Sequence, residues 1–413
     1  MALARRAQLW VLLSAMVLLL PCCAARPMKP SRQCMQFDAW RFTPPARVAS
    51  AAFGAQDRLT ICATDERLYA LDTRSGAMIW SASIPPRADG LVVTLDSVIV
   101  WNGQWGVRCF TVGGKKSWAR ADLRPTSILS PVPDRLWIAT NKDVLLLDGK
   151  SGITLKSFPA QLKRACLLAE SLGAVYFCTE NDQLRKCDGK TGRMQWVAKL
   201  EYSLSSQGAS VLDGKLIATN LREPGLVGGP GRLLCLDASS GAVLWKGEWL
   251  EGVEWHSSSN LLFVESWSAD SLESGHFISS LYDLGGSRLP SFSKGVVTGR
   301  NNVLVSDEEA VYYLSGDFHL YAYSLRTRTL LWERMPPHSE ELIASPGSIA
   351  LPANSDFIYC FTPYYVSVFD KTSGKLVCDW DSGGYTGEAV VGSKDVILVP
   401  SWNNLVVVHL SSP

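Results

Sequence analysis

The sequence has few of the residues and motifs on which most catalytic centres depend. It contains five histidines in 413 residues, and none stands at a metal-ligand spacing such as His-x-x-x-His. It has no Cys-x-x-Cys pair, which disfavours a zinc site, and no Gly-x-Ser-x-Gly motif of serine hydrolases. We therefore predict no catalytic residue, no metal ligand and no cofactor-binding residue from motifs.

An excess of one charge is also lacking. Forty basic residues stand against 39 acidic ones, so the composition gives no sign of the basic surface that binds nucleic acid. No linker or low-complexity stretch follows residue 48 or so, while apolar residues make up 47% of the chain and include 15 tryptophans. These features predict one folded domain with a large core.

What the sequence does contain is a repeat. Five times an aspartate is followed four residues later by a glycine, with Ser or Thr just before the glycine, and a short apolar run precedes four of these aspartates. Asp can accept hydrogen bonds from the backbone of a turn, and Gly can take the positive φ that such a turn needs. The unit therefore predicts strand, turn, strand, with its turns at Asp72/Gly76, Asp148/Gly152, Asp188/Gly192, Asp237/Gly241 and Asp370/Gly374.

Three weaker copies fill the gaps, at 111–118, 283–286 and 324–332. The turns then begin at residues 72, 111, 148, 188, 237, 283, 324 and 370, which are 37 to 49 residues apart. A period of this length in β-rich sequence is typical of a propeller with one four-stranded blade per repeat, the general architecture of WD40-type proteins. We predict an all-β protein with a single propeller, of eight blades in preference to nine or seven.

The two ends of the chain complement each other. Three strands are expected after the last full repeat, at 388–391, 396–400 and 405–410, without a fourth. Residues 35–42 look like an outer strand with no partners of its own before it. This strand is predicted to complete the last blade and close the ring, which would remove an open sheet edge.

Residues 1–25 are predicted to be a secretory signal peptide, followed by the propeller at 26–413. Arginines at 5–6 precede a 12-residue apolar run, 9–20, which is short for a membrane span. Cleavage near Ala25, lipidation at Cys22 or Cys23, and retention as an anchor remain open alternatives. Of the 11 cysteines, nine lie beyond this segment, and most of those stand in apolar strand runs, where Cys acts as a small buried hydrophobe.

Residues 68–80 and 233–245 resemble the tryptophan-docking repeat of the PQQ-like, or quinoprotein-dehydrogenase-like, β-propellers. The resemblance implies a propeller, usually of eight blades, in which recurrent tryptophans pack between blades. In this sequence that role is implied for Trp80, Trp118, Trp196, Trp245, Trp332 and Trp380, together with the Asp and Gly residues of the five turns.

Two kinds of protein share this repeat. Quinoprotein dehydrogenases hold PQQ over calcium and use an Asp as base, in longer chains, whereas shorter BamB-like members are non-enzymatic scaffolds that dock partners through their loops. The length of this chain matches the second kind. The resemblance therefore implies a scaffold with no cofactor, and a PQQ-dependent oxidoreductase with calcium is the alternative.

The strand order places two sets of connections on opposite faces of the disc. One face carries the Asp turns, and the other carries the connections between second and third strands and between blades, which we call the loop face. Aromatic residues beside Asn, Gln and Ser on the loop face have the composition of a recognition surface. The alternative is that the rings fold back over the blade below. The predicted binding residues are Trp101, Trp105, Trp267, Tyr364, Tyr365 and Trp402.

Together these features predict an exported, non-catalytic propeller whose partner is an envelope or extracellular protein, a glycan or a peptide. The expected location is the periplasm or outer membrane in a bacterium, and otherwise the secretory lumen or the exterior. Contact with a membrane is expected only through an N-terminal lipid or anchor.

Overall fold

A computed structural model describes most of the chain beyond the N-terminal segment. The described residues are 26–27, 37–46, 48–54, 59–64, 66–132, 134–159, 166–171, 173–179, 183–221, 230–258, 261–267, 277–288, 303–314, 319–327, 329–337, 348–352, 355–361, 365–381, 390–391, 396–400 and 405–410. Within these ranges no helix combines the length and apolar character needed to cross a membrane. The predicted signal peptide, Cys22, Cys23 and Ala25 lie outside them.

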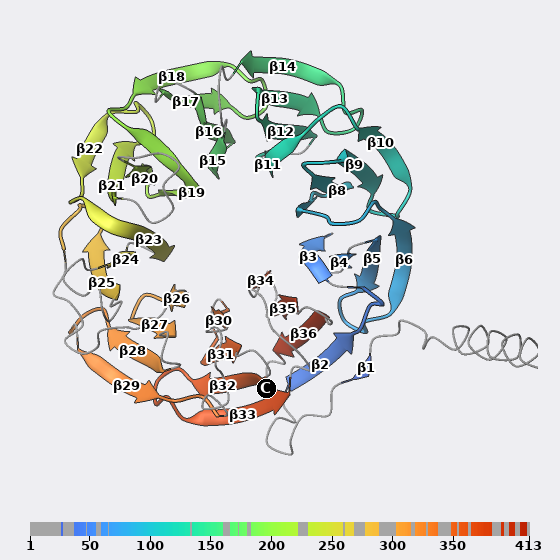
Figure 1. Cartoon of the computed structure of the whole chain (residues 1–413). Coiled ribbons are helices and arrows are strands. Elements are labelled where there is room, and N and C mark those ends of the chain that lie inside the picture. The colour runs from blue at the N-terminus through green and yellow to red at the C-terminus, as the bar shows by residue number, and fades with distance from the viewer. Residues whose placement is uncertain are drawn as a thin grey trace, which may run out of the picture.

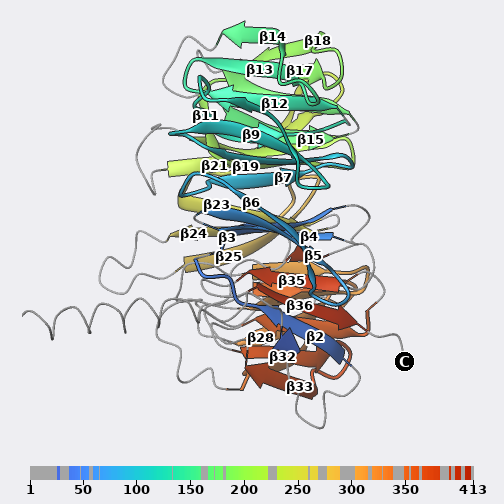
Figure 2. The same cartoon turned by 90° about the vertical axis from the view of Figure 1, so that its right-hand side faces the viewer.

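The strands form antiparallel sheets arranged as blades around a central axis (Figure 1), and the blades together make a disc seen edge-on in Figure 2. The first two blades contain β3 (Val48–Gly54), β4 (Leu59–Thr64), β5 (Arg67–Asp72) and β6 (Met78–Ser83), then β7 (Gly90–Val93), β8 (Ser97–Asn102), β9 (Gly106–Thr111) and β10 (Lys116–Arg120). The next two contain β11 (Pro125–Leu129), β12 (Arg135–Thr140), β13 (Asp143–Asp148) and β14 (Thr154–Pro159), then β15 (Cys166–Ser171), β16 (Ala174–Thr179), β17 (Gln183–Asp188) and β18 (Met194–Lys199).

Two more four-stranded sheets follow later in the chain. They contain β26 (Val303–Ser306), β27 (Ala310–Leu314), β28 (Leu320–Ser324) and β29 (Leu330–Arg334), then β30 (Ser348–Ala350), β31 (Phe357–Phe361), β32 (Tyr365–Asp370) and β33 (Leu376–Asp381). Between the two groups lies a seven-stranded sheet of β19 (Ser203–Leu212), β20 (Lys215–Leu221), β21 (Pro230–Asp237), β22 (Val243–Lys246), β23 (Leu250–Ser258), β24 (Leu261–Trp267) and β25 (Phe277–Asp283).

The seven-stranded sheet arises from a local change in pairing. β22 is short, and after it Gly247 donates its backbone N–H to the Leu233 carbonyl. The chain then returns to the edge of β21, where Gly231 pairs with Leu250 and Pro230 with Glu251 at the start of β23. These two residue pairs join β19–β22 to β23–β25.

The eighth sheet combines the two ends of the chain. It has the order β1 (Arg26–Pro27), β2 (Phe37–Phe42), β36 (Leu405–Leu410), β35 (Val396–Pro400), β34 (Val390–Val391). β2 pairs with β36 along its whole length, from Phe37 opposite Leu410 to Phe42 opposite Leu405. The described residues thus give an all-β propeller with seven separate blades of four or five strands and one seven-stranded sheet.

Burial explains the sequence pattern of the strands. The third strand of a blade, such as β13, is buried at four consecutive positions, because neighbouring blades cover both faces of the sheet. The outermost strand, such as β18, alternates between exposed and partly buried residues. Six cysteines in these strands are buried, as predicted: Cys109, Cys178, Cys187, Cys235, Cys360 and Cys378.

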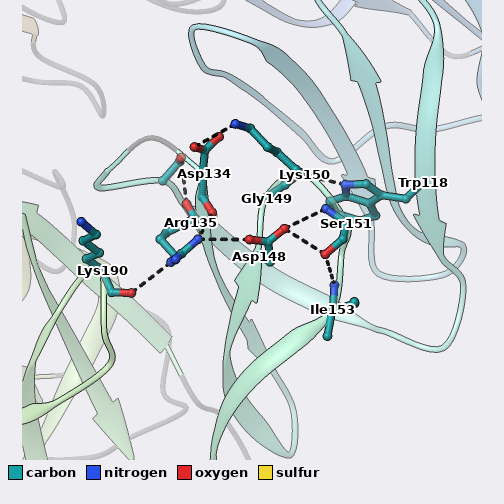
Figure 3. A network of polar contacts seen from close by, with 10 residues as sticks. Trp118, Asp134, Arg135, Asp148, Gly149, Lys150, Ser151, Ile153 and Lys190 are labelled. Carbon is teal, nitrogen blue, oxygen red and sulfur yellow. Dashed lines mark hydrogen bonds and ion pairs between the residues drawn. The ribbon is translucent and has the colours of Figure 1, made fainter.

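The Asp turns follow one hydrogen-bonding scheme, drawn for Asp148 in Figure 3. Asp148 Oδ1 accepts hydrogen bonds from the backbone N–H and the hydroxyl of Ser151, each at 2.9 Å. The Gly152 N–H donates to the Asp148 carbonyl at 2.8 Å, with φ of +70° at the glycine. Arg135 reaches from Asp148 Oδ2 to the Lys190 carbonyl in the turn of the next blade. The φ values at the other four turn glycines, Gly76, Gly192, Gly241 and Gly374, lie between +64° and +75°.

Tryptophans on five outer strands each contact a turn in the following repeat. The ring of Trp196 lies against Gly241, where an added Cβ would be 2.7 Å from the ring, and its Nε1 donates to the Ala238 carbonyl at 3.3 Å. The same arrangement of ring, glycine and carbonyl recurs for Trp80 on Gly114 and Val112, Trp118 on Gly152 and Gly149, Trp245 on Gly286 and Leu284, and Trp332 on Gly374 and Lys371. The side chain of Trp380 lies outside the described residues.

One outer strand, β14, has no tryptophan. There the Lys156 side chain covers Gly192 and donates Nζ to its carbonyl at 3.2 Å. Trp137 of β12, fully buried, donates to the Gly189 carbonyl at 2.9 Å. This junction therefore keeps a hydrogen-bonded contact with the next turn by other side chains.

The N-terminal strand contacts the first blade in the same way. Trp40 of β2 donates Nε1 to the Thr73 carbonyl at 2.7 Å, in the turn between β5 and β6. Trp40 and Phe42 pack in one cluster with Leu405 and Val407 of β36 and with Tyr69 of β5. β2 therefore links the last sheet to the first.

The glycine at a docked turn should be harder to replace than a glycine with the same backbone conformation elsewhere. Gly241→Ala introduces both a positive-φ strain and a clash with Trp196, whereas Gly214→Ala, at φ +69° with open space around its Cβ position, introduces the strain alone. Strain of this kind costs about 1–2 kcal/mol. In urea unfolding we expect Gly241→Ala to lose at least ~1 kcal/mol more than Gly214→Ala, and equal losses would argue against a role for the ring contact.

Removal of residues 35–42 should destabilise the whole domain. It exposes the edge of β36 and takes away the buried rings of Trp40 and Phe42, each of which would cost roughly 3–5 kcal/mol on truncation. We expect a cooperative thermal transition at a clearly lower temperature than that of the full chain. An unchanged transition would mean that β36 is covered in some other way.

Candidate binding face

The carboxylates of the Asp-turn face are engaged by their own turns. The pKa values of Asp72, Asp148, Asp188 and Asp370 are lowered, first of all by the hydroxyl of the Ser or Thr three residues later. Hydrogen bonds from Ser239 and then Ser240 lower the pKa of Asp237 to about 2. A general acid or base needs a pKa near the operating pH, so these groups are unsuited to that work.

On the loop face, two of the predicted aromatic residues are partly buried in the second blade. The Trp101 ring lies against Gly90, where an added Cβ would be 2.6 Å from the ring, and it packs on the core beneath. Trp105 donates Nε1 to the Pro86 carbonyl at 2.9 Å and has the Arg108 guanidinium 5.7 Å from its ring centroid. Both rings therefore have packing contacts in the fold.

Of the other four predicted residues, Tyr365 and Trp267 belong to described strands. Tyr365, partly buried, begins β32 in a blade remote from β8 in Figure 1. Trp267 ends β24, and its side chain lies outside the described residues, as do Tyr364 and Trp402 altogether. Of the three aromatics whose side chains are described, Trp101 and Trp105 lie in one blade and Tyr365 lies in another.

The structure places a cleft on the loop face where β18 leads into β19. It has a volume of about 330 Å³, at the lower end of the range for ligand sites. One wall is the end of β18 with residues 199–201, and the other is formed by β20, β21 and β22. The lining residues are Lys199, Leu200, Glu201, Asn220, Arg232, Leu234, Val243 and Lys246.

Arg232 is the centre of this site. Its guanidinium carbon lies 4.4 Å from the Trp249 ring centroid and 5.6 Å from that of Tyr202, and the two rings meet edge to face. Arg232 Nη2 is 3.0 Å from Glu201 Oε2, and Lys246 Nζ is 3.1 Å from the same oxygen. Lys246 and then Arg232 lower the pKa of Glu201. The guanidinium is thus held in place by two rings and a carboxylate.

Two buried polar atoms in the cleft have no hydrogen-bond partner. They are Oδ1 of Asn220 and Nε of Arg232. Asn220 is 2% exposed, and its Nδ2 donates to the Tyr202 carbonyl at 2.6 Å, which fixes the amide with Oδ1 as the free acceptor. Because unpaired buried polar atoms are costly and uncommon, they are candidates for ligand contacts.

The residues of this cleft were not among the predicted binding residues. Tyr202, Arg232 and Trp249 belong to no motif of the sequence. They meet because Asn220 pairs with Arg232 across β20 and β21 and because two connections between blades converge beside them. Neither the strand register nor this convergence can be read from local spacing.

Among the described residues, no three or more His, Cys, Asp and Glu side chains gather where a metal ion could be held. The cleft itself offers three basic side chains and one carboxylate, which is the wrong chemistry for a hard cation.

Comparison with known proteins agrees with the repeat. Residues 106–252 match the family model for the outer membrane protein assembly factor BamB, which confirms the resemblance to BamB-like, PQQ-type repeats over that part of the chain. A search of curated proteins gave no match.

Among solved structures, the computationally designed Ika8 protein has a TM-score of 0.55 at 11% identity, over 82% of this chain and 97% of Ika8, and it shares the fold. BamB from Moraxella catarrhalis has a TM-score of 0.44 at 12% identity, over 94% of this chain and all of that chain. Hsv2 from Kluyveromyces lactis has a TM-score of 0.46 at 9% identity, over 70% of this chain and 98% of that chain.

The structural assignment of the Asp turns can be tested through pH. The pKa of Asp237 is about 2 in the folded protein and ~3.9 when unfolded, so its charge adds stability above about pH 4 and loses that contribution as the pH falls through about 2. Asp237→Asn should therefore melt at a lower temperature than wild type at about pH 6, and the difference should shrink toward pH 2. A difference that stays constant with pH would show that the charge is not stabilising.

Proposed function

We propose that this chain is an exported, non-catalytic propeller that binds another protein through its loop face. The observation that carries the proposal is the group of Tyr202, Arg232 and Trp249 beside an open cleft on that face. Tyr, Trp and Arg are the residue types that contribute most to binding energy in protein interfaces. The match to the BamB family model supports the same role.

The residues of the cleft are suited to binding without further reorganisation. Arg232 has an 11% exposed side chain and is already ordered by two rings and Glu201, so its rotamer entropy is lost on folding and not on binding. Lys246 and Glu201, at 42% and 53% exposure, lie at the edge of the cleft. A buried centre with a charged edge is the usual layout of a protein interface.

The remaining features of the proposal concern the scaffold. We infer that β2 closes the ring, supported by its pairing with β36 and its Trp40 contact with the first blade. We infer that β23–β25 act as a blade of their own, because Trp245 of β22 docks on the turn after β25 as other tryptophans dock on the next blade.

The proposed scaffold carries no cofactor and works in the periplasm or at the outer membrane of a bacterium, or otherwise in the secretory lumen or outside the cell.

Site-specific photo-crosslinking tests which face binds. A benzophenone amino acid is placed at Lys246 or Gln104 on the loop face, and at Arg74 or Lys150 in the Asp turns as controls, all of them exposed positions. In native cells we expect the Lys246 position to give an adduct with one recurring protein, and the turn positions to give none. Each variant should melt as wild type does. The same adduct from both faces, or from the turn face alone, would contradict the proposal.

A further inference from the structure

We propose that the cleft binds an acidic peptide segment of the partner, with a peptide group on Asn220 and Arg232 and a carboxylate on Lys199 and Lys246. This inference rests on the proposed protein-binding function and names the chemistry of what is bound. It is supported by the two buried unpaired atoms, Asn220 Oδ1 and Arg232 Nε, and by the net positive charge of the residues that line the cleft.

Asn220 shares an unpaired side-chain oxygen with Thr179 but differs from the residues at the same place in three other blades. Where the second strand ends, Thr64 accepts hydrogen bonds from the N–H groups of Glu66 and Arg67, and Thr140 accepts from those of Lys142 and Asp143. In the second blade Asn102 accepts from Gln104 N–H at 2.6 Å. These side-chain oxygens cap the short turn that follows. Asn220 precedes a much longer connection, and its oxygen is left unpaired.

The unpaired atoms together match a peptide group. Asn220 and Arg232 are directly opposite on β20 and β21, so their side chains leave the same face of the sheet as neighbours. Asn220 Oδ1 is an acceptor without a donor, and Arg232 Nε–H is a donor without an acceptor. A peptide unit offers one N–H and one C=O, and can therefore satisfy both.

The charge of the lining selects an acidic side chain on that peptide. Lys199, Arg232 and Lys246 outnumber the single carboxylate, Glu201, so the cleft has a net positive charge. Glu201 already occupies Lys246 Nζ and Arg232 Nη2. An incoming carboxylate can share Lys246, whose ammonium has three donors, and can take Lys199. Glu201 then acts as a competing anion for the same cations.

This arrangement predicts opposite effects of two neighbouring charge changes. Lys246→Gln should weaken binding of an acidic peptide about tenfold, as expected for loss of a charge-assisted hydrogen bond. Glu201→Gln should strengthen it several-fold, because the competing carboxylate is gone. Lys116→Gln, at an exposed position on β10, changes the net charge as Lys246→Gln does and should leave binding unaltered.

The probes are two sets of labelled, acetylated and amidated hexapeptides, one with Asp or Glu at the third position and one with Asn or Gln there. Fluorescence anisotropy with the full chain at low salt should show at least about tenfold tighter binding of the acidic set. Asn220→Leu should weaken binding of the acidic set, with thermal melting as the check on folding. If Asn220→Leu does not fold stably, Lys246→Gln still tests the inference, because Lys246 is exposed and its replacement should not affect folding.

Three outcomes would overturn the inference. They are equal binding of the two peptide sets, equal effects of Lys246→Gln and Lys116→Gln, and binding of oligogalacturonate in place of peptide, which would assign the cleft to acidic sugars. If the peptide test fails but a loop-face position still crosslinks to one protein, the scaffold function stands and the cleft binds a ligand of other chemistry. Failure of both experiments would remove the function as well.

Discussion

The contact between an outer-strand tryptophan and the turn glycine of the next blade is the interaction on which the fold depends. A propeller blade has little connection to its neighbours through the backbone, because each sheet satisfies its own hydrogen bonds. Trp80, Trp118, Trp196, Trp245 and Trp332 supply that connection with a ring against a glycine and an N–H on a carbonyl. The turn is held in shape by its Asp, so the glycine is presented at a fixed place. Five junctions between successive repeats therefore use one repeated, local device.

This device explains why the repeat could be recognised in the sequence. Asp, Ser or Thr, Gly and Trp are each required by a local cause: hydrogen bonding within the turn, positive φ, and close approach of a ring. These requirements involve residues that are close in sequence or separated by about one repeat. The residue types that meet them therefore recur along the sequence with a regular period. The outer-strand character of residues 37–42 was predictable for the same reason, since Trp40 belongs to a strand that docks on the first blade.

The candidate site depended on information that a local pattern does not contain. The pair Trp101 and Trp105 looked exposed in the sequence, but Trp101 packs on Gly90, the residue directly opposite it on β7. Conversely, Tyr202 and Trp249 lie in two separate connections between strands, and both rings meet Arg232 of β21. Trp267, Tyr364 and Trp402 remain predictions.

The cleft lies where the repeat is least regular, and this has a physical reason. Docking constrains the Asp turn and the outer strand, so variation that leaves the fold intact is confined to the connections of the opposite face. In the fifth unit both connections differ from the others: the one after Asn220 is long, and Gly247 ends the ladder of β22 so that the chain can rejoin the edge of β21. That return carries Trp249 over Arg232, next to the unpaired oxygen of Asn220. The departure from the repeat that joins two sets of strands into one sheet thus supplies the aromatic support of the site.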